Sequence, residues 1–164
     1  ICIYFILTHT RINRSMLNSD SFTFGLKIET NTPTNPLGFK VSINDNTFFN
    51  ELITKTKTTI EFIVPNNTEN INYNVNLEMY GKNESHVMSD EHGMIEITDL
   101  YIDNILLIHK DGVASPFHET VKYYYKNTSE PYTTYLGHNG ILSFDISTPL
   151  YIWLLENSYG AKPI

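Results

Sequence analysis

Residues 71–80 read Ile-Asn-Tyr-Asn-Val-Asn-Leu-Glu-Met-Tyr, and this stretch decides the fold class. Apolar side chains stand at every second position from Ile71 to Met79, and polar side chains fill the positions between them. Successive side chains of a β-strand point to opposite faces, so this pattern predicts a strand with one buried and one exposed face. The 3.6-residue period of a helix does not fit it.

Shorter stretches with the same character lie on both sides of this strand. They span residues 22–28, 39–43, 47–50, 58–64, 94–98, 100–108, 119–125, 140–146 and 150–155. Turn-forming residues separate them, as in the predicted hairpin turn 44–46, and no connection is long enough for a crossover helix. One helical turn is expected near residues 50–54. The sequence therefore predicts an all-β protein, a two-sheet antiparallel β-sandwich.

The composition agrees with this fold and excludes several classes of protein. The chain is 41% hydrophobic, 13% aromatic and only 18% charged, which is typical of neither a coiled coil nor a disordered segment. Its net charge of −7 repels a phosphate backbone, so we expect no nucleic-acid partner. The single cysteine, Cys2, excludes an internal disulfide framework, which fits folding in a reducing cytosol.

The first fifteen residues differ from the rest of the chain. The apolar run at residues 1–7 is too short to cross a bilayer, and basic residues follow it where a signal peptide would place them first. We expect residues 1–15 to be a non-native or disordered extension, residues 16–164 to form one β-sandwich domain, and no membrane partner. The alternative is a genuine amino-terminal strand or a membrane-proximal stub.

Four stretches together resemble a known group of proteins. They are the loop Tyr80-Gly81-Lys82-Asn83, the His-rich acidic turn at 86–93, the alternating run 95–105 and the closing stretch 148–157, Thr-Pro-Leu-Tyr-Ile-Trp-Leu-Leu-Glu-Asn. The chain resembles small β-sandwich proteins of contractile-tailed marine phages, which are similar in pattern to jelly-roll carbohydrate-binding modules. The resemblance covers residues 20–157. It implies a jelly-roll fold and a role on the virion or at the host surface, and it carries over no catalytic residue.

The turn at residues 86–93 is a candidate metal site. Its His86, Asp90 and Glu91 offer one imidazole and two carboxylates within six positions. Oxygen ligands suit calcium, and the resemblance implies a structural Ca²⁺ because jelly-roll binding modules often carry one at such a loop. A transition metal is a further alternative. The plain alternative is a solvated polar loop without metal, and no other cofactor is expected.

Aromatic and amide side chains make the second candidate site. Sugar rings stack their C–H faces on aromatic rings, and nearby amides fix the hydroxyl groups. The predicted ligand-binding residues are Tyr123, Tyr125, Tyr132, Tyr135, Trp153, Asn72, Asn74 and Asn76. The competing interpretation is that these aromatic residues fill the sandwich core or an interface between copies of the chain.

No catalytic motif accompanies these residues. Asp99, Asp103 and Asp111 are the best carboxylates for acid–base chemistry, but Asp99 and Asp103 fit a solvated strand face. We expect a non-catalytic carbohydrate-binding module made in the host cytoplasm and located in the virion, where it contacts host-surface polysaccharide or other glycans. The alternative is a structural virion protein, a capsid decoration or tail component, acting through contacts with its own copies or other virion proteins.

Overall fold

The computed structural model describes residues 21–65, 72–109, 121–126, 128–130, 133–147 and 152–153. The expected extension at residues 1–15 and the candidate residues Asp111 and Tyr132 lie outside the described residues. Within the described part, no helix is long and apolar enough to cross a membrane.

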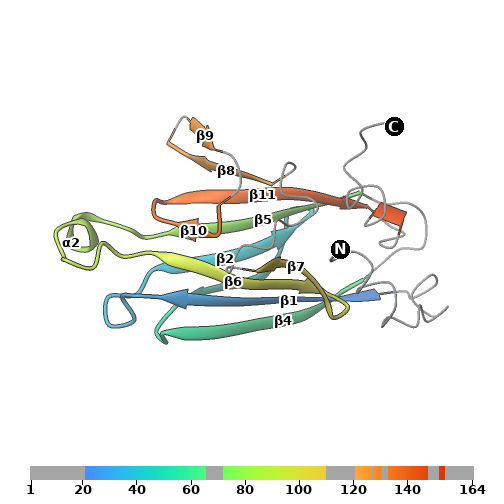
Figure 1. Ribbon diagram of the computed structural model, residues 1–164, viewed down its shortest axis with the longest axis horizontal. Coiled ribbons are helices and arrows are strands. Elements are labelled where there is room, and N and C mark those ends of the chain that lie inside the picture. The colour runs from blue at the N-terminus through green and yellow to red at the C-terminus, as the bar shows by residue number, and fades with distance from the viewer. Residues whose placement is uncertain are drawn as a thin grey trace, which may run out of the picture.

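The described strands form two antiparallel sheets. Sheet A contains β1 (Ser21–Thr30), β4 (Lys57–Pro65), β6 (Ile95–Ile102), β7 (Ile105–His109) and β10 (Tyr135–Leu136), in the order β10-β6-β1-β4 with β7 beside β6. Sheet B contains β2 (Gly38–Ile43), β3 (Asn46–Leu52), β5 (Asn72–Tyr80), β8 (Lys122–Tyr125), β9 (Thr128–Glu130) and β11 (Gly140–Ser147), in the order β3-β2-β5-β11-β8-β9. Figure 1 shows the two layers, with the one-turn helix α2 (Glu84–Val87) at one end. The predicted two-sheet antiparallel β-sandwich is confirmed.

In β5, buried and outward-facing side chains alternate as the sequence predicts. Tyr73, Val75, Leu77 and Met79 are all at most 4% exposed and face the other sheet, while the asparagines between them lie on the outer side. The inward side chains of β1, from Phe22 to Ile28, meet them in one hydrophobic core. Burying each such side chain contributes about 1.5–3 kcal/mol, so the core sets the strand register.

Two tight hairpin turns use residues that tolerate left-handed backbone. The predicted turn after β2 is confirmed, with φ of 48° at Asn44 and 65° at Asp45. The sequence reading of 100–108 as one strand is wrong, because Asp103 and Asn104 (φ 48° and 64°) form a second hairpin turn there. The Asp103 carboxylate accepts a hydrogen bond from the Thr23 backbone N–H at 2.8 Å, so Asp103 belongs to the turn and shares no strand face with Asp99.

Two further expectations are corrected. Residues 50–52 continue β3, because Leu52 pairs with Gly38 of β2, so the helical turn expected at 50–54 does not form. The helix α2 lies at 84–87, where the sequence predicted a loop. The stretch 150–155 is expected as a strand, but its described residues, Ile152 and Trp153, have helical backbone. Trp153 is only 7% exposed and packs into the core.

Candidate functional site

Three chain connections meet at the α2 end of the sandwich and enclose a cleft. They are the β5–β6 connection, which carries α2, the β10–β11 connection and the β8–β9 turn. The cleft measures about 580 Å³. Its described lining residues, called the loop-end cleft below, are Lys82, Val87, His92, Lys126, Tyr135, Gly137, His138 and Asn139. Its size falls within the range of small-molecule sites.

Two tyrosines of β8 hold the imidazole of His138 in place. The Tyr125 ring stacks on it, with ring centroids 4.7 Å apart and planes 9° from parallel. The Tyr123 hydroxyl donates to the His138 carbonyl oxygen and accepts from the His138 backbone N–H, which lies 3.2 Å away. A ring held on one face and a backbone held at two atoms give a site that is ordered before any ligand arrives.

Lys82 and Asn139 lock the β5–β6 and β10–β11 connections together. The Asn139 side chain accepts from the Lys82 backbone N–H at 2.8 Å and donates to the Lys82 carbonyl oxygen at 2.9 Å. The Lys82 ammonium donates to the carbonyl oxygens of Gly137 at 2.6 Å and His92 at 3.1 Å. Burial lowers the pKa of Lys82. An ammonium carries three N–H groups, so one remains for a ligand.

Two residues of the cleft have left-handed backbone. Six described residues other than glycine have positive φ, and four of them are the Asn and Asp residues of the two hairpin turns. The other two are His92 (φ 50°) and Lys126 (φ 47°), and both line the cleft. Left-handed backbone is unfavourable for such side chains, and it is concentrated at functional sites in proteins.

The predicted metal ligands do not come together. His86 is 2% exposed, and its ring nitrogens contact Asn83 and the Asn35 carbonyl oxygen, the latter at 2.9 Å from Nε2. It closes a capping box with Asn83 at the start of α2. Asp90 and Glu91 are exposed, and the described residues contain no group of three His, Cys, Asp or Glu side chains able to hold a metal. The imidazole is therefore a structural part of the loop.

The three predicted asparagines lie on the outer face of sheet B, away from the loop-end cleft. Asn76 donates to Asn74 at 2.7 Å, Asn74 donates to Asp145 at 2.9 Å, and Asn72 accepts from Ser147 at 2.7 Å. Each amide thus has a side-chain partner on the same face of the sheet. These bonds link β5 to β11 across the exposed face of the sheet.

The predicted aromatic residues separate into three groups. Tyr123 (2% exposed) and Trp153 are buried, so their rings offer no stacking face, which corrects the expectation that they bind ligand. Strand alternation instead exposes Tyr124, on the outer face of sheet B. Tyr125 is half-buried behind His138, and Tyr135 is 46% exposed in the cleft. Among the described candidates, only Tyr135 combines exposure with a place in the cleft.

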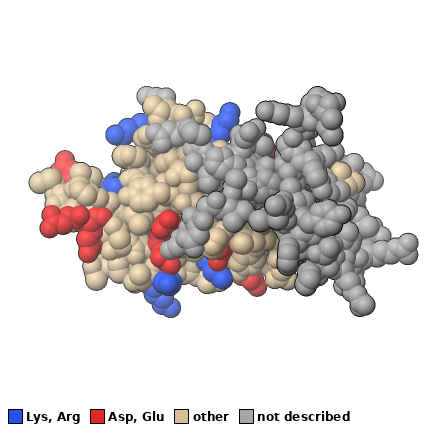
Figure 2. Space-filling model, viewed as in Figure 1, with Lys and Arg blue, Asp and Glu red and all other residues tan. Residues whose placement is uncertain are grey.

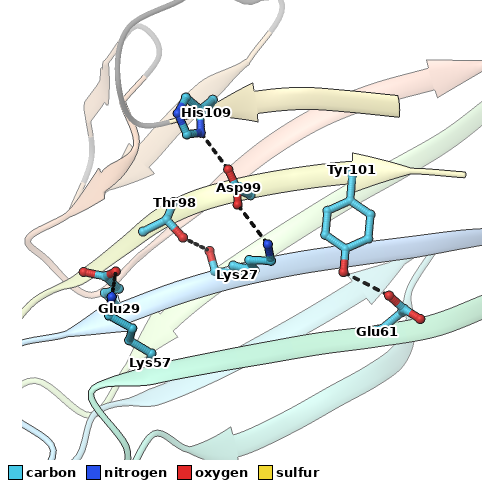
Figure 3. Close-up of polar contacts among 8 residues, drawn as sticks. All are labelled: Lys27, Glu29, Lys57, Glu61, Thr98, Asp99, Tyr101 and His109. Carbon is cyan, nitrogen blue, oxygen red and sulfur yellow. Dashed lines mark hydrogen bonds and ion pairs between the residues drawn. The ribbon is translucent and has the colours of Figure 1, made fainter. Parts of the chain in front are cut away.

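A charged cluster on the outer face of sheet A is the other site of note. Asp99 lies between His109 Nδ1 at 2.6 Å and the Lys27 ammonium at 3.3 Å (Figure 3). Burial raises the pKa of Asp99, but the hydrogen bonds and charges of His109 and Lys27 outweigh burial, and the pKa lies below its usual value. A carboxylate that contacts the Lys27 ammonium and the His109 imidazole is suited to holding β1, β6 and β7 together.

The sequence matches no protein-family model. It also matches no curated protein. Among solved structures, it is similar to vCBM60 in complex with galactobiose, with a TM-score of 0.49 and 7% identity over 76% of this chain and 99% of that chain. The chain is also similar to the selenomethionine form of vCBM60, which was studied as part of an evolutionary link between two families of calcium-dependent carbohydrate-binding modules. Here the TM-score is 0.47 and the sequence identity is 8%, over 75% of this chain and 89% of that chain. A likeness this distant specifies neither a ligand nor a metal.

Proposed function

We propose that this protein is a non-catalytic carbohydrate-binding module whose ligand site is the loop-end cleft. The observation that carries the proposal is the convergence of an exposed aromatic ring, a fixed imidazole and hydrogen-bond donors around one cleft. Tyr135 supplies the ring, His138 the imidazole, and Lys82 and Asn139 the donors. Binding sites for small molecules typically combine apolar and aromatic side chains with a few well-placed polar groups.

The chemistry of a sugar matches these groups. A pyranose ring presents C–H groups on its faces, which pack on aromatic rings, and hydroxyl groups around its edge, which need hydrogen-bond partners. In the cleft, Tyr135 is free to pack on such a face. One amide hydrogen of Asn139 and one ammonium hydrogen of Lys82 remain after their bonds to the protein. These groups would bind hydroxyl oxygens at the ring edge.

The contacts that order the cleft support a role in ligand binding. Tyr123, Tyr125 and the Lys82–Asn139 pair order the His138 loop in advance, so a ligand does not have to order it. His92 and Lys126 keep left-handed backbone that asparagine or glycine would adopt with less strain. Left-handed backbone at non-glycine residues clusters at ligand-binding sites, which supports a role in binding for these two lining residues.

We extend the proposal to a location in the virion and to contact with host-surface glycans. This part is supported by the sequence resemblance to phage proteins alone. Mass spectrometry of particles purified from the source culture tests it. Peptides of the chain should copurify with the particles, and their absence from purified particles would contradict this location.

Calorimetric titration of the full chain with a panel of disaccharides tests the proposed function. The panel includes galactobiose, the ligand present in a distant structural neighbour. Tyr135→Ala should weaken binding by about ten-fold or more, as expected for an exposed aromatic anchor. Tyr124→Ala is the matched control, because Tyr124 is also 46% exposed but is not among the described lining residues of the loop-end cleft.

Two results would overturn the proposal. Loss of binding in Tyr124→Ala with full binding in Tyr135→Ala would move the site to the outer face of sheet B. Absence of binding across neutral and acidic sugars would favour the alternative of a structural protein that acts through contacts with other proteins.

A further inference from the structure

The loop-end cleft is cationic in a protein that is anionic overall. Lys82, Lys126, His92 and His138 line it, and no carboxylate is among its described lining residues. The whole chain, by contrast, carries a net charge of −7. Neither lysine makes an ion pair with a carboxylate in the described part of the chain, whereas Lys27, Lys40 and Lys57 each do.

The acidic side chains at this end lie outside the cleft. Glu84, Asp90 and Glu91 are exposed on α2 and the loop that follows it, and Figure 2 shows acidic side chains gathered at the outer tip of the molecule. Glu96 pairs with Tyr135 across β6 and β10 but does not line the cleft. Salt screens charges over about 8 Å at physiological ionic strength, and Glu96, directly opposite Tyr135, lies within that range. The charge in contact with a ligand inside the cleft is nevertheless that of the lining lysines, because Glu96 is not among the described lining residues.

Lys82 is prepared for a negative partner. Two of its ammonium hydrogens are held by the carbonyl oxygens of Gly137 and His92, which fixes the direction of the third. Burial lowers the pKa of Lys82, which means that its charge is incompletely solvated in the free protein. An anion in the cleft would stabilise that charge, and a neutral hydroxyl would do so less well.

We infer that the loop-end cleft selects an anionic glycan, whose carboxylate or sulfate group is held by Lys82 and Lys126. This inference rests on the proposed function and narrows its ligand class. Neutral sugars would use the Tyr135 ring and the Asn139 amide but leave both ammonium groups without an opposite charge.

Because Lys126 has left-handed backbone, one substitution can remove its charge without disturbing the backbone. Asparagine adopts positive φ more readily than lysine does, so Lys126→Asn removes the charge without straining the β8–β9 turn. Lys40→Asn is the matched control, because it removes the same charge from the outer face of sheet B. Circular dichroism and the midpoint of thermal unfolding check that both variants fold.

The experiment compares galactobiose, digalacturonate and a sulfated galactobiose in titrations of the full chain. At least one anionic sugar should bind about ten-fold more tightly than galactobiose, because an ionised partner strengthens hydrogen bonds to ammonium groups. Lys126→Asn should weaken anionic binding about five-fold and change galactobiose binding less than two-fold, while Lys40→Asn changes neither. The carboxylated and sulfated arms identify which anion the cleft takes.

Each adverse result has a distinct meaning. If galactobiose binds as tightly as both anionic sugars and Tyr135→Ala abolishes that binding, the proposed function stands and the anionic selectivity is wrong. If Lys126→Asn has the same affinity for anionic sugars as the unmodified chain, the assignment of Lys126 is wrong. If no sugar binds, both the proposed function and this inference fail.

Discussion

The Tyr101 ring lies directly across Gly25 on the neighbouring strand of sheet A. A Cβ atom at position 25 would stand 1.9 Å from the ring carbon Cε2, so only glycine leaves room for the ring. The Tyr101 hydroxyl passes over β1 and donates to Glu61 of β4 at 2.9 Å (Figure 3). Sheet B repeats the arrangement, with Tyr80 over Gly38 and its hydroxyl donating to Asn50 at 2.6 Å. A tyrosine thus ties together three strands in each sheet.

Gly25→Ala should destabilise the fold by about 1–3 kcal/mol, because the new methyl group displaces the Tyr101 ring and breaks its bond to Glu61. In a Tyr101→Ala background the same substitution should be neutral or stabilising by up to about 1 kcal/mol, since alanine suits a strand better than glycine does. Urea denaturation of the four proteins measures this coupling. An equal cost in both backgrounds would show that the ring and the glycine act independently.

Asp99→Asn should lower the free energy of unfolding at pH 6 by about 1 kcal/mol, because it removes the ion pair with Lys27 and the contact of the carboxylate with the His109 imidazole. The folded pKa of Asp99 lies below the reference value of 3.8, so its contribution is complete above that value and is lost as pH falls through the folded pKa. The difference between the two proteins should therefore shrink below about pH 4. Asp45→Asn, in the β2–β3 turn, is the charge-matched control, and a difference that persists at pH 2.5 would contradict the ion-pair account.

His86→Ala should cost about 2–3 kcal/mol of stability, because it leaves the Asn35 carbonyl oxygen and the Asn83 backbone N–H without their imidazole partner. Val87→Ala is the control at an exposed neighbouring position. EDTA should leave the Tm of the unmodified chain unchanged, as expected for a structural histidine. A fall in Tm with EDTA that calcium reverses, absent in His86→Ala, would restore the metal interpretation.

Tyr123→Phe should weaken glycan binding several-fold although Tyr123 is buried. Its hydroxyl holds the backbone of His138, so its loss lets the imidazole leave the position it occupies against Tyr125. Tyr73→Phe also removes a tyrosine hydroxyl from the core and is the control. Calorimetry measures the affinities, and NMR of the His138 ring reports its position. Unchanged affinity in Tyr123→Phe would exclude a positioning role.

The strands were predictable from the sequence because each depends on its own alternation. Residues 72–80 and 140–147 show this, since burial of every second side chain leaves one permitted register. The turn at Asp103–Asn104 was missed because apolar residues flank it closely on both sides, and these two turn-forming residues interrupt the apolar stretch only briefly. The helical Ile152 and Trp153 were missed for a related reason, since a short apolar run fits a strand and a helix equally well.

The candidate site was less predictable because its parts are brought together by the fold. Tyr135 was named from the sequence, but Lys82, His92, His138 and Asn139 come from connections far apart in the chain. Their only local signals were the Gly-Lys-Asn loop at 81–83 and the Gly-His-Asn-Gly turn at 137–140. Which tyrosine of the 123–125 run faces solvent depended on the pairing of β8 with β11, which the sequence pattern left open.

The most direct test of the account is an NMR titration of the ¹⁵N-labelled full chain with the sugar that binds most tightly in the calorimetric panel. We predict that the Asn139 side-chain amide and the backbone amides of Gly137 and His138 shift together, with one dissociation constant. The side-chain amides of Asn74 and Asn76 should not move. Shifts confined to those outer-face amides and to Tyr124, with the β10–β11 connection unchanged, would contradict the assignment of the loop-end cleft as the binding site.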